Sequence, residues 1–351
     1  MNRSNWCILP IILGLLSGVA LWAQQKPGDP PKPPTPQAES NITLPPLSDP
    51  ENLNSLSING SNLKAREPVV GEKDVFPEFT RELIQVQWRT GDAIDLYIIK
   101  PTETVKPPVV LYLYGYPSET DRFRDNDYCK RITFNGYAAI GFVPALTGQR
   151  YHDRPMKEWF VSQLPEALTK SVHDVQMVLR YLAERNDLDL SRVGIFGQGS
   201  GGTVAILAAG VEPQIRTVDA LEPWGDWPTW LAKSSLIPET ERPAYLKPEF
   251  LAGVAPLDPV QWLGRVQAKS MRLQFVLDDT VTPAAAAQRM KAAARPPAQV
   301  VEYPTKHEQY EALGGGRAFD WIKQQLQPAN ASTDKSQVSD NQPKTLNEKV
   351  H

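Results

Sequence analysis

The feature that most constrains the fold of this 351-residue chain is a glycine cluster that directly follows a short apolar run. Residues 193–196 read Val-Gly-Ile-Phe, and residues 197–202 read Gly-Gln-Gly-Ser-Gly-Gly. The apolar run predicts a strand buried on both faces, and the apolar residues 204–209 predict a helix immediately after the glycines. Glycine permits a tight turn in which two backbone segments approach closely. The pattern therefore predicts a strand–turn–helix unit.

Short apolar runs alternate with helical periods on both sides of this unit. Residues 83–88 and 94–99 flank Thr90-Gly91-Asp92, a pattern typical of a β-hairpin. A helix is predicted from Val172 to just before Asp187. Further strands are predicted at residues 108–114, 137–143, 218–221, 273–277 and 299–303, and a final helix at 319–326. This alternation predicts an α/β fold with a mostly parallel sheet covered by helices on both faces.

The N-terminal segment 1–23 is predicted to be a signal peptide. Arg3 supplies a positive start, residues 8–20 are almost wholly apolar, and Ala23 suits a cleavage site. We therefore expect an exported protein, periplasmic or extracellular. The alternative is an uncleaved membrane anchor, because residues 6–23 are just long enough to span a membrane if tilted.

The other segment boundaries follow composition. Residues 24–75 are predicted to be a mostly disordered linker, because nine prolines between positions 27 and 50 remove amide donors and favour extended backbone. Residues 76–327 form the predicted α/β domain. The polar residues 328–351 lack an apolar period and predict a disordered tail.

Four tryptophans fall in a proline-containing region, residues 224–262, that fits the strand–helix alternation poorly. We expect a small cap over the carboxyl ends of the strands, where open α/β sheets bind ligands. The tryptophans either line a pocket for a small-molecule or peptide ligand, or only pack the cap onto the body. A net charge of −3 without a block of like charge predicts no nucleic-acid partner, and any membrane contact only through the N-terminal segment.

The glycines also favour one residue as the centre of the turn. In a Gly-x-Ser-x-Gly elbow, small residues lie two before and two and three after the nucleophile. Gly197, Gly201 and Gly202 meet this requirement when Gly199 is central, which leaves Ser200 one residue too late. The alternative register makes Ser200 central but places Gln198 and Thr203 at the small positions. A phosphate-binding loop is disfavoured because its lysine is absent.

Residues suited to acid–base chemistry follow other predicted strands. Asp279 comes after the strand at 273–277, and His307 comes after the strand at 299–303. A histidine that accepts a hydroxyl proton and a carboxylate that orients it form a hydrolytic triad, with Ser200 as the available hydroxyl. The backbone amides of Tyr116 and Ser200 are the expected oxyanion donors. His152 and His173 are interpreted as structural.

The stretches just described resemble the α/β-hydrolase superfamily, and within it the dienelactone-hydrolase and prolyl-oligopeptidase-like branch of esterases and peptidases. The resemblance rests on residues 107–117, 174–182, 192–197 and 279–283 and on His307. It implies an α/β-hydrolase fold with a small tryptophan-rich cap and the order nucleophile, acid, histidine. It implies no metal and no organic cofactor. The sequence departs from the family at residues 114–117, where Tyr-Gly-Tyr-Pro replaces His-Gly-Gly-Pro, and at Gly199, where the family has its serine.

Two functions are consistent with this elbow. The first is a protein of the serine esterase and peptidase lineage in which Gly199 at the nucleophile position impairs catalysis and the pocket serves for binding. The alternative is an active hydrolase of carboxylic esters or peptides that uses Ser200 with His307 and Asp279. Direct activation of water by His307 and Asp279 is ranked last, because removing triad members leaves serine hydrolases only modest residual catalysis.

Overall fold

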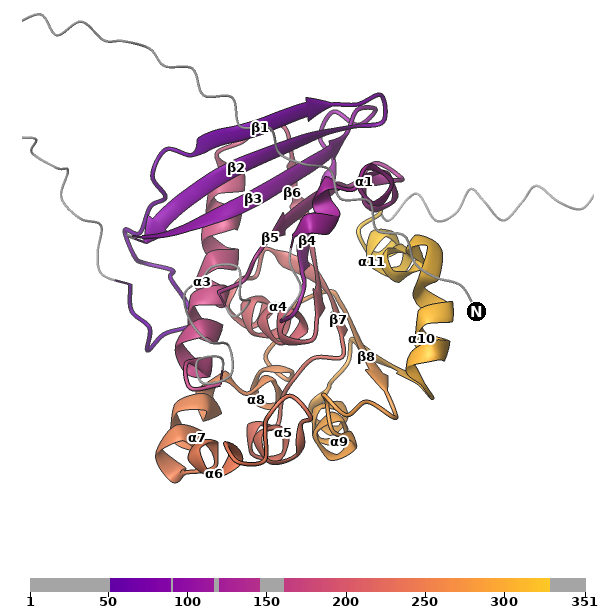
Figure 1. Cartoon of the computed structure of the whole chain (residues 1–351). Coiled ribbons are helices and arrows are strands. Elements are labelled where there is room, and N and C mark those ends of the chain that lie inside the picture. Colours follow the sequence, from indigo (N-terminus) through magenta and orange to yellow (C-terminus); the bar gives the residue numbers. More distant parts are fainter. Residues whose placement is uncertain (1–50, 90, 117–119, 146–160, 329–351) are drawn as a thin grey trace, which may run out of the picture. The chain divides into compact units, whose positions relative to one another are not determined.

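The computed structural model describes residues 51–89, 91–116, 120–145 and 161–328 (Figure 1). The predicted signal peptide at 1–23, the proline-rich stretch 24–50 and residues 329–351 of the predicted tail lie outside the described residues, as does His152. In the described part of the chain, no helix is both long enough and apolar enough to span a membrane.

The described residues form a nine-stranded sheet with the strand order β1-β2-β3-β5-β4-β6-β7-β8-β9. The strands are β1 (Val69–Val75), β2 (Phe79–Arg89), β3 (Asp92–Pro101), β4 (Pro108–Leu113), β5 (Ala138–Phe142), β6 (Asp189–Gln198), β7 (Ile215–Leu221), β8 (Ser270–Val276) and β9 (Ala298–Tyr303).

The sheet has an antiparallel part and a parallel part. Strands β1, β2, β3 and β5 pair antiparallel in that order, and β5 to β9 pair parallel through β4 and β6. The predicted hairpin is confirmed, because β2 and β3 pair over ten residue positions and Gly91 in the turn has φ +72°. At the outer edge, the pairing of β1 with β2 contains a bulge between Val70 and Glu72. The predicted mostly parallel sheet is therefore confirmed.

Helices cover both faces of the sheet, as the alternation predicted (Figure 1). They are α1 (Asn126–Thr133), α3 (Leu164–Ala183), α4 (Ser200–Val211), α5 (Trp227–Lys233), α6 (Arg242–Tyr245), α7 (Pro248–Val254), α8 (Pro259–Trp262), α9 (Ala284–Ala293), α10 (Lys306–Leu313) and α11 (Asp320–Gln325). Short 3₁₀ turns lie at Asp121–Arg124, Ala255–Leu257 and Gly314–Phe319.

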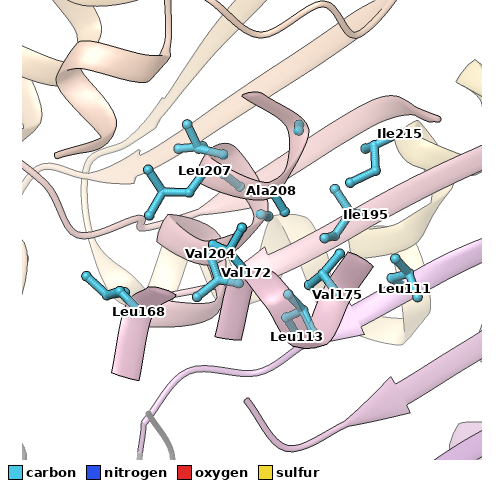
Figure 2. Packing of buried hydrophobic residues seen from close by; sticks show 14 of the residues in the cluster. Leu111, Leu113, Leu168, Val172, Val175, Ile195, Val204, Leu207, Ala208 and Ile215 are labelled. Atoms are coloured by element: carbon cyan, nitrogen blue, oxygen red, sulfur yellow. The ribbon is translucent and has the colours of Figure 1, made fainter. Parts of the chain in front are cut away.

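Strand β4 shows how the two layers of core arise. Its side chains alternate between faces, as successive residues of a strand must. Leu111 and Leu113 pack with α3 and α4, where Leu168, Val172 and Val204 meet them (Figure 2). Val110 and Tyr112 belong instead to a second core with residues of α1 and α11. Burial on both faces explains why this strand is a continuous apolar run.

The cap is built from α5 to α8 and holds three of the four tryptophans of its region in the core. Trp224 and Trp230 stack with ring centroids 4.8 Å apart, and Trp227 meets Trp230 edge-on at 5.6 Å. The Asp258 carboxylate accepts hydrogen bonds from the backbone amides of Asp226, Trp227 and Val260 and so ties α8 to the start of α5. Burial raises the pKa of the Asp258 carboxyl, although these amides oppose the shift. Packing thus accounts for Trp227 and Trp230.

The ordered domain begins before the predicted boundary at residue 76. Strand β1 lies within the segment predicted to be linker, and residues 51–66, here named the strap, run along α3. Leu56, Ile58 and Leu63 of the strap are buried in the core. These apolar residues are too widely spaced in a polar stretch to suggest a core element by periodicity. These side chains are buried because they pack in the same core as the apolar residues of α3.

Candidate active site

The turn between β6 and α4 has the conformation of a strained elbow at one residue. Strand β6 ends at Gln198, α4 begins at Ser200, and Gly199 between them has φ +56° and ψ −124°. Side-chain-bearing residues adopt such backbone angles only at a cost of about 1–3 kcal/mol. The Gly199 amide donates to the Leu221 carbonyl at the end of β7, a bond of 2.9 Å that holds the turn against the sheet.

The neighbouring glycines are required because backbone segments touch there. A Cβ on Gly197 would lie 2.2 Å from the Gly201 carbonyl oxygen, and one on Gly201 would lie 2.2 Å from the Leu113 carbonyl oxygen. A Cβ on Gly199, in contrast, would meet Trp224 Nε1 at an ordinary 3.5 Å. The positions that tolerate no side chain are therefore two residues before and two after Gly199.

The Ser200 side chain is buried beside this turn. Ser200 is 2 % exposed, and its Oγ accepts a hydrogen bond of 2.9 Å from the Tyr116 backbone amide. The Tyr116 amide is one of the two predicted oxyanion donors, and in the structure it donates to the serine hydroxyl. Gly115 makes this approach feasible, because a Cβ there would lie 2.4 Å from the Gln198 carbonyl oxygen.

Two cavities lie beside the elbow. The inner cavity has a volume of about 220 Å³ and is lined by Gly199, Tyr116, Trp224, Asp279, Glu222 and Lys306, among others. The outer cavity has a volume of about 580 Å³ and is mostly aromatic and apolar, with Tyr114, Phe196, Tyr310 and Phe319 in its wall. Gln198 and Lys306 line both cavities. Ser200 is not among the described residues that line either one.

Asp279 lies in the turn after β8 and lines the inner cavity. Its two carboxylate oxygens accept hydrogen bonds from the amides of Val281 at 2.9 Å and Thr282 at 3.1 Å. Within the described residues, the carboxylate therefore caps its own turn.

His307 is the second residue of α10 and lines the outer cavity. Its side chain is 78 % exposed, and its Nε2 lies 3.3 Å from Glu311 Oε1 one helical turn further on. Asp279 and His307 thus come from the expected strand ends, but they line different cavities and bind different partners.

A buried carboxylate that the sequence reasoning missed lies between them. Glu222 follows β7, is 7 % exposed and has φ +50°, which is rare for a residue with a long side chain. Its Oε1 accepts hydrogen bonds from Lys306 Nζ and from Gln309 Nε2, the latter at 3.0 Å. Its carbonyl also accepts from the Thr282 hydroxyl at 3.4 Å. Glu222 therefore joins the end of β7, the Asp279 turn and α10.

The signal for Glu222 in the sequence is slight. It is a carboxylate at the carboxyl end of a parallel strand, followed by Pro223. Such strand ends commonly carry site residues, yet neither the positive φ nor the pairing with Lys306 is visible in the residue types. In the described residues, no group of three or more histidine, cysteine, aspartate or glutamate side chains is arranged to hold a metal ion.

Comparison with known proteins agrees with this architecture. Residues 94–246 match the sequence model of the Dienelactone hydrolase family. No curated protein sequence is significantly similar to the chain. The acetyl xylan esterase from Paenibacillus sp. R4 superposes with a TM-score of 0.61 and 16 % identity, covering 78 % of this chain and 92 % of that one.

Two further structures share the fold. Acetyl xylan esterase 1 from Thermoanaerobacterium sp. JW/SL YS485 gives a TM-score of 0.57 at 16 % identity and covers 74 % of this chain and 88 % of that one. The acylaminoacyl peptidase of Pyrococcus horikoshii gives 0.53 at 16 % identity, covering 78 % of this chain but only 44 % of that one.

The described part of the chain therefore has the α/β-hydrolase fold of these structures, and residues 94–246 are similar to the Dienelactone hydrolase family. This confirms the predicted fold.

Proposed function

We propose that this protein binds a small-molecule or peptide ligand in the cavities beside the elbow and has lost nucleophilic catalysis. The observation that carries the proposal is Gly199, which has φ +56° and ψ −124° between β6 and α4 and offers no hydroxyl to the inner cavity. The glycine contacts on either side support the register in which this residue is the one that the lineage uses as nucleophile.

The surroundings of Ser200 and His307 support the same conclusion. A serine nucleophile needs its base within hydrogen-bond reach. The Ser200 hydroxyl is instead buried against the Tyr116 amide, and His307 is exposed and paired with Glu311. Small errors in the position of catalytic groups cost heavily in rate, so this arrangement disfavours a displaced nucleophile.

The rival function is an active hydrolase of carboxylic esters or peptides in which Ser200 acts with His307 and Asp279. Treating the full chain with a fluorophosphonate probe and mapping the modified residue by mass spectrometry distinguishes the two. We expect no labelling of the wild-type chain. Labelling at Ser200 that is lost in both Ser200→Ala and His307→Ala would contradict the binding proposal.

A restored nucleophile provides the positive control. The Gly199→Ser variant has space for its Cβ beside Trp224. We expect it to react with the probe at residue 199 and to hydrolyse p-nitrophenyl acetate at least about tenfold faster than the wild type. A variant that folds but neither reacts nor hydrolyses would show that a hydroxyl at residue 199 has no base within reach, as the exposed position of His307 implies.

The aromatic wall of the outer cavity and the indole of Trp224 in the inner one suit a ligand with an apolar body. Since two structural neighbours are acetyl xylan esterases, acetylated xylo-oligosaccharides are a first class to test for binding, monitored by tryptophan fluorescence. Binding that persists unchanged in Trp224→Phe and Tyr310→Ala would argue against these cavities.

We further propose that the protein is exported through residues 1–23, with membrane anchoring as the alternative. The support is the charged, apolar and small-residue pattern of that segment. N-terminal sequencing of the protein from its native host tests this. A mature chain that begins at Gln24 supports export with cleavage, and an intact N-terminus in the membrane fraction supports the anchor.

A further inference from the structure

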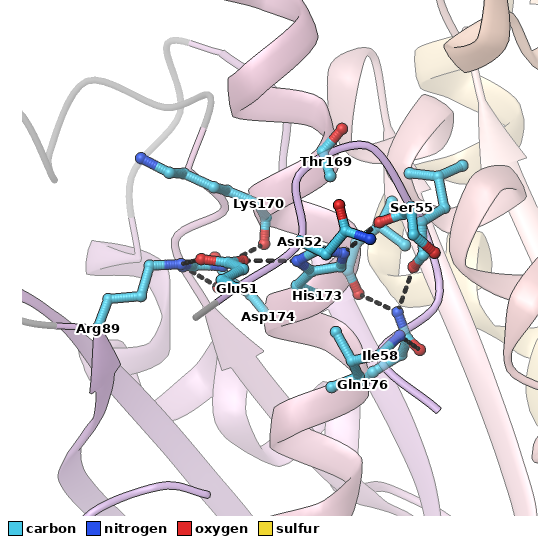
Figure 3. Close-up of polar contacts among 12 residues, drawn as sticks. Glu51, Asn52, Ser55, Ile58, Arg89, Thr169, Lys170, His173, Asp174 and Gln176 are labelled. Carbon is cyan, nitrogen blue, oxygen red and sulfur yellow. Dashed lines mark hydrogen bonds and ion pairs between the residues drawn. The ribbon is translucent and has the colours of Figure 1, made fainter. Parts of the chain in front are cut away.

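Two carboxylates of the described structure differ in how fully the protein bonds them. At the strap, Arg89 donates to both oxygens of Glu51, from Nε at 2.5 Å and from Nη2 at 2.6 Å (Figure 3). At the inner cavity, Glu222 is bonded through Oε1, which accepts from Lys306 Nζ and Gln309 Nε2. Its Oε2 accepts no hydrogen bond from the described residues, although Glu222 is only 7 % exposed and lines the cavity. A buried acceptor without a partner is costly, so this oxygen atom is suited to a ligand.

The inner cavity carries an excess of negative charge. Asp279 lines it together with Glu222, and each Asp279 oxygen accepts one backbone amide, which leaves each able to accept a further hydrogen bond. Lys306 supplies the one cation among the described residues that line this cavity. Its side chain is 54 % exposed and is paired with Glu222. Two carboxylates therefore share a volume of about 220 Å³ with one ammonium group.

The indole of Trp224 forms an aromatic wall of the same cavity. A Cβ on Gly199 would lie 3.5 Å from its Nε1 and 3.7 Å from its Cε2, so the glycine leaves this part of the ring accessible from the turn. Trp230 stacks on Trp224 with ring centroids 4.8 Å apart and holds the ring in place. Leu236 and Val281 add apolar surface. An indole attracts cations through its π electrons and packs against apolar groups.

These features favour an organic cation over other ligands. An anion would be brought against two carboxylates, and the one ammonium group of the lining is already bound by Glu222. A metal ion lacks ligands, because the described residues contain no group of three or more histidine, cysteine, aspartate or glutamate side chains arranged to hold one. An uncharged ligand leaves the excess negative charge unbalanced. A primary ammonium group supplies both a positive charge and three hydrogen-bond donors.

We propose that the inner cavity binds the ammonium group of a small organic amine, which donates to Glu222 Oε2 and to the Asp279 carboxylate while its apolar body packs against Trp224. The inference rests on the proposed function, in which the cavities beside the elbow bind a ligand. Gly199 then has two consequences, because it offers no hydroxyl and leaves the indole accessible to the amine. Lys306 holds Oε1 of Glu222, but its positive charge opposes that of the ligand and lowers the affinity.

Three probes that share a phenyl ring and differ in the charge of the other end test this preference. They are 2-phenylethylammonium, 2-phenylethanol and 3-phenylpropionate, titrated into the full chain at about pH 7 by calorimetry. We expect the ammonium probe to bind at least about tenfold more tightly than the alcohol, as for charge-assisted hydrogen bonds, and the carboxylate to bind most weakly. The preference should shrink as salt is added. An alcohol or carboxylate that binds as tightly as the ammonium probe, or an ammonium probe that does not bind, would overturn the inference.

Removing the competing cation gives a gain of binding. Lys306→Met leaves Glu222 and Asp279 without an ammonium partner in the cavity lining, so the ammonium probe should bind about threefold more tightly and the alcohol should bind as before. A loosened α10 would weaken binding, so this gain separates the charge of the cavity from structural damage. An affinity for the ammonium probe that stays the same or falls would contradict the role given to the carboxylates.

Removing a carboxylate gives the opposite result. Asp279→Asn and Glu222→Gln should each lower the affinity for the ammonium probe about tenfold and bring it close to that for the alcohol. Asp278→Asn is the matched control, because Asp278 is exposed and is not among the residues that line either cavity. If Asp278→Asn lowers the affinity as much as Asp279→Asn, the total charge of the protein sets the preference and the inference is wrong.

The inference and the proposed function fail by different results. Equal binding of the three probes would remove the preference for ammonium and leave the cavities as a binding site. Fluorophosphonate labelling of Ser200 that is lost in Ser200→Ala and His307→Ala would contradict the loss of nucleophilic catalysis, whichever probe binds best.

Discussion

The two halves of the candidate site are held together by different means. The elbow half consists of the ends of β4 and β6 and the start of α4, where carbonyl oxygens and glycine Cα atoms are in direct contact. The α10 half consists of Glu222, the Asp279 turn and the start of α10, which are joined by long side chains. The geometry of a backbone contact does not change when a nearby side chain is lost. In a network of side chains, the loss of one member leaves its partners to form other hydrogen bonds.

This difference explains which parts of the site keep their geometry without a serine at residue 199. The turn geometry, the Tyr116 amide and the close glycines do not depend on a serine hydroxyl, so they persist beside Gly199. In the α10 half, Lys306 and Gln309 donate hydrogen bonds to Glu222. His307 pairs instead with Glu311. The geometry of the elbow half is thus held by backbone packing, whereas the side chains of the α10 half are held by polar partners.

The largest effect is expected from a methyl group added inside the elbow half. Gly201→Ala would bring a Cβ to 2.2 Å from the Leu113 carbonyl oxygen, an atom of the backbone and not of a flexible side chain. We expect the free energy of unfolding to fall by about 3 kcal/mol or more, measured by urea denaturation. Gly264→Ala is the control, because no atom lies within 4 Å of its added Cβ. Equal stability of the two variants would contradict backbone contact as the basis of this half.

A smaller loss is expected when the network of the α10 half is broken. Glu222→Gln removes the charge that Lys306 binds at a residue only 7 % exposed. Because the Lys306 side chain is 54 % exposed and its ammonium returns to water, we expect the free energy of unfolding to fall by about 2 kcal/mol and amide exchange in α10 to become faster. Glu311→Gln, at an exposed side chain, should change neither quantity. An unchanged α10 in Glu222→Gln would show that this helix is held by other contacts.

A methyl group added at the centre of the turn should lower the free energy of unfolding less than one added at the packed positions on either side. Gly199→Ala places a Cβ in ordinary contact with Trp224, so its cost is the strain of φ +56° alone. We expect about 1–2 kcal/mol, clearly below the loss in Gly201→Ala. If the two substitutions are equally costly, the elbow does not distinguish its centre from its flanks.

The smallest effect is expected at the exposed histidine. His307→Ala removes a side chain that is 78 % exposed and pairs only with the exposed Glu311 in the described structure. We expect the stability to change by less than about 0.5 kcal/mol. A loss comparable with that of Glu222→Gln would mean that His307 turns inward in solution and belongs to the network of the α10 half.

The elbow half could be predicted from the sequence because its close backbone contacts require glycine at particular positions. Only glycine fits where two backbones touch, so Gly197 and Gly201 favour the register in which Gly199, two residues from each, is the centre of the turn. The continuous apolar runs likewise predict buried parallel strands, since strand β4 needs apolar side chains on both faces.

The α10 half and the strap could not be predicted to the same depth. The order of Asp279 and His307 identifies the strand ends from which they come, but not the direction of their side chains. Glu222 looks like any other glutamate until its backbone and its partner Lys306 are known. The strap depends on Gln176, 118 residues from Ile58 in sequence, and no local pattern reports such a pairing.

The bulge in β1 has a consequence for the outer edge of the sheet. β1 is an edge strand, and its exposed valines, Val69, Val70 and Val75, would suit the addition of a strand from a second molecule. The bulge after Val70 interrupts the regular ladder, and the charged residues 72–74 would have to be brought against a neighbouring chain. In the described part of the chain, both features oppose edge-to-edge pairing of β1 with a second molecule.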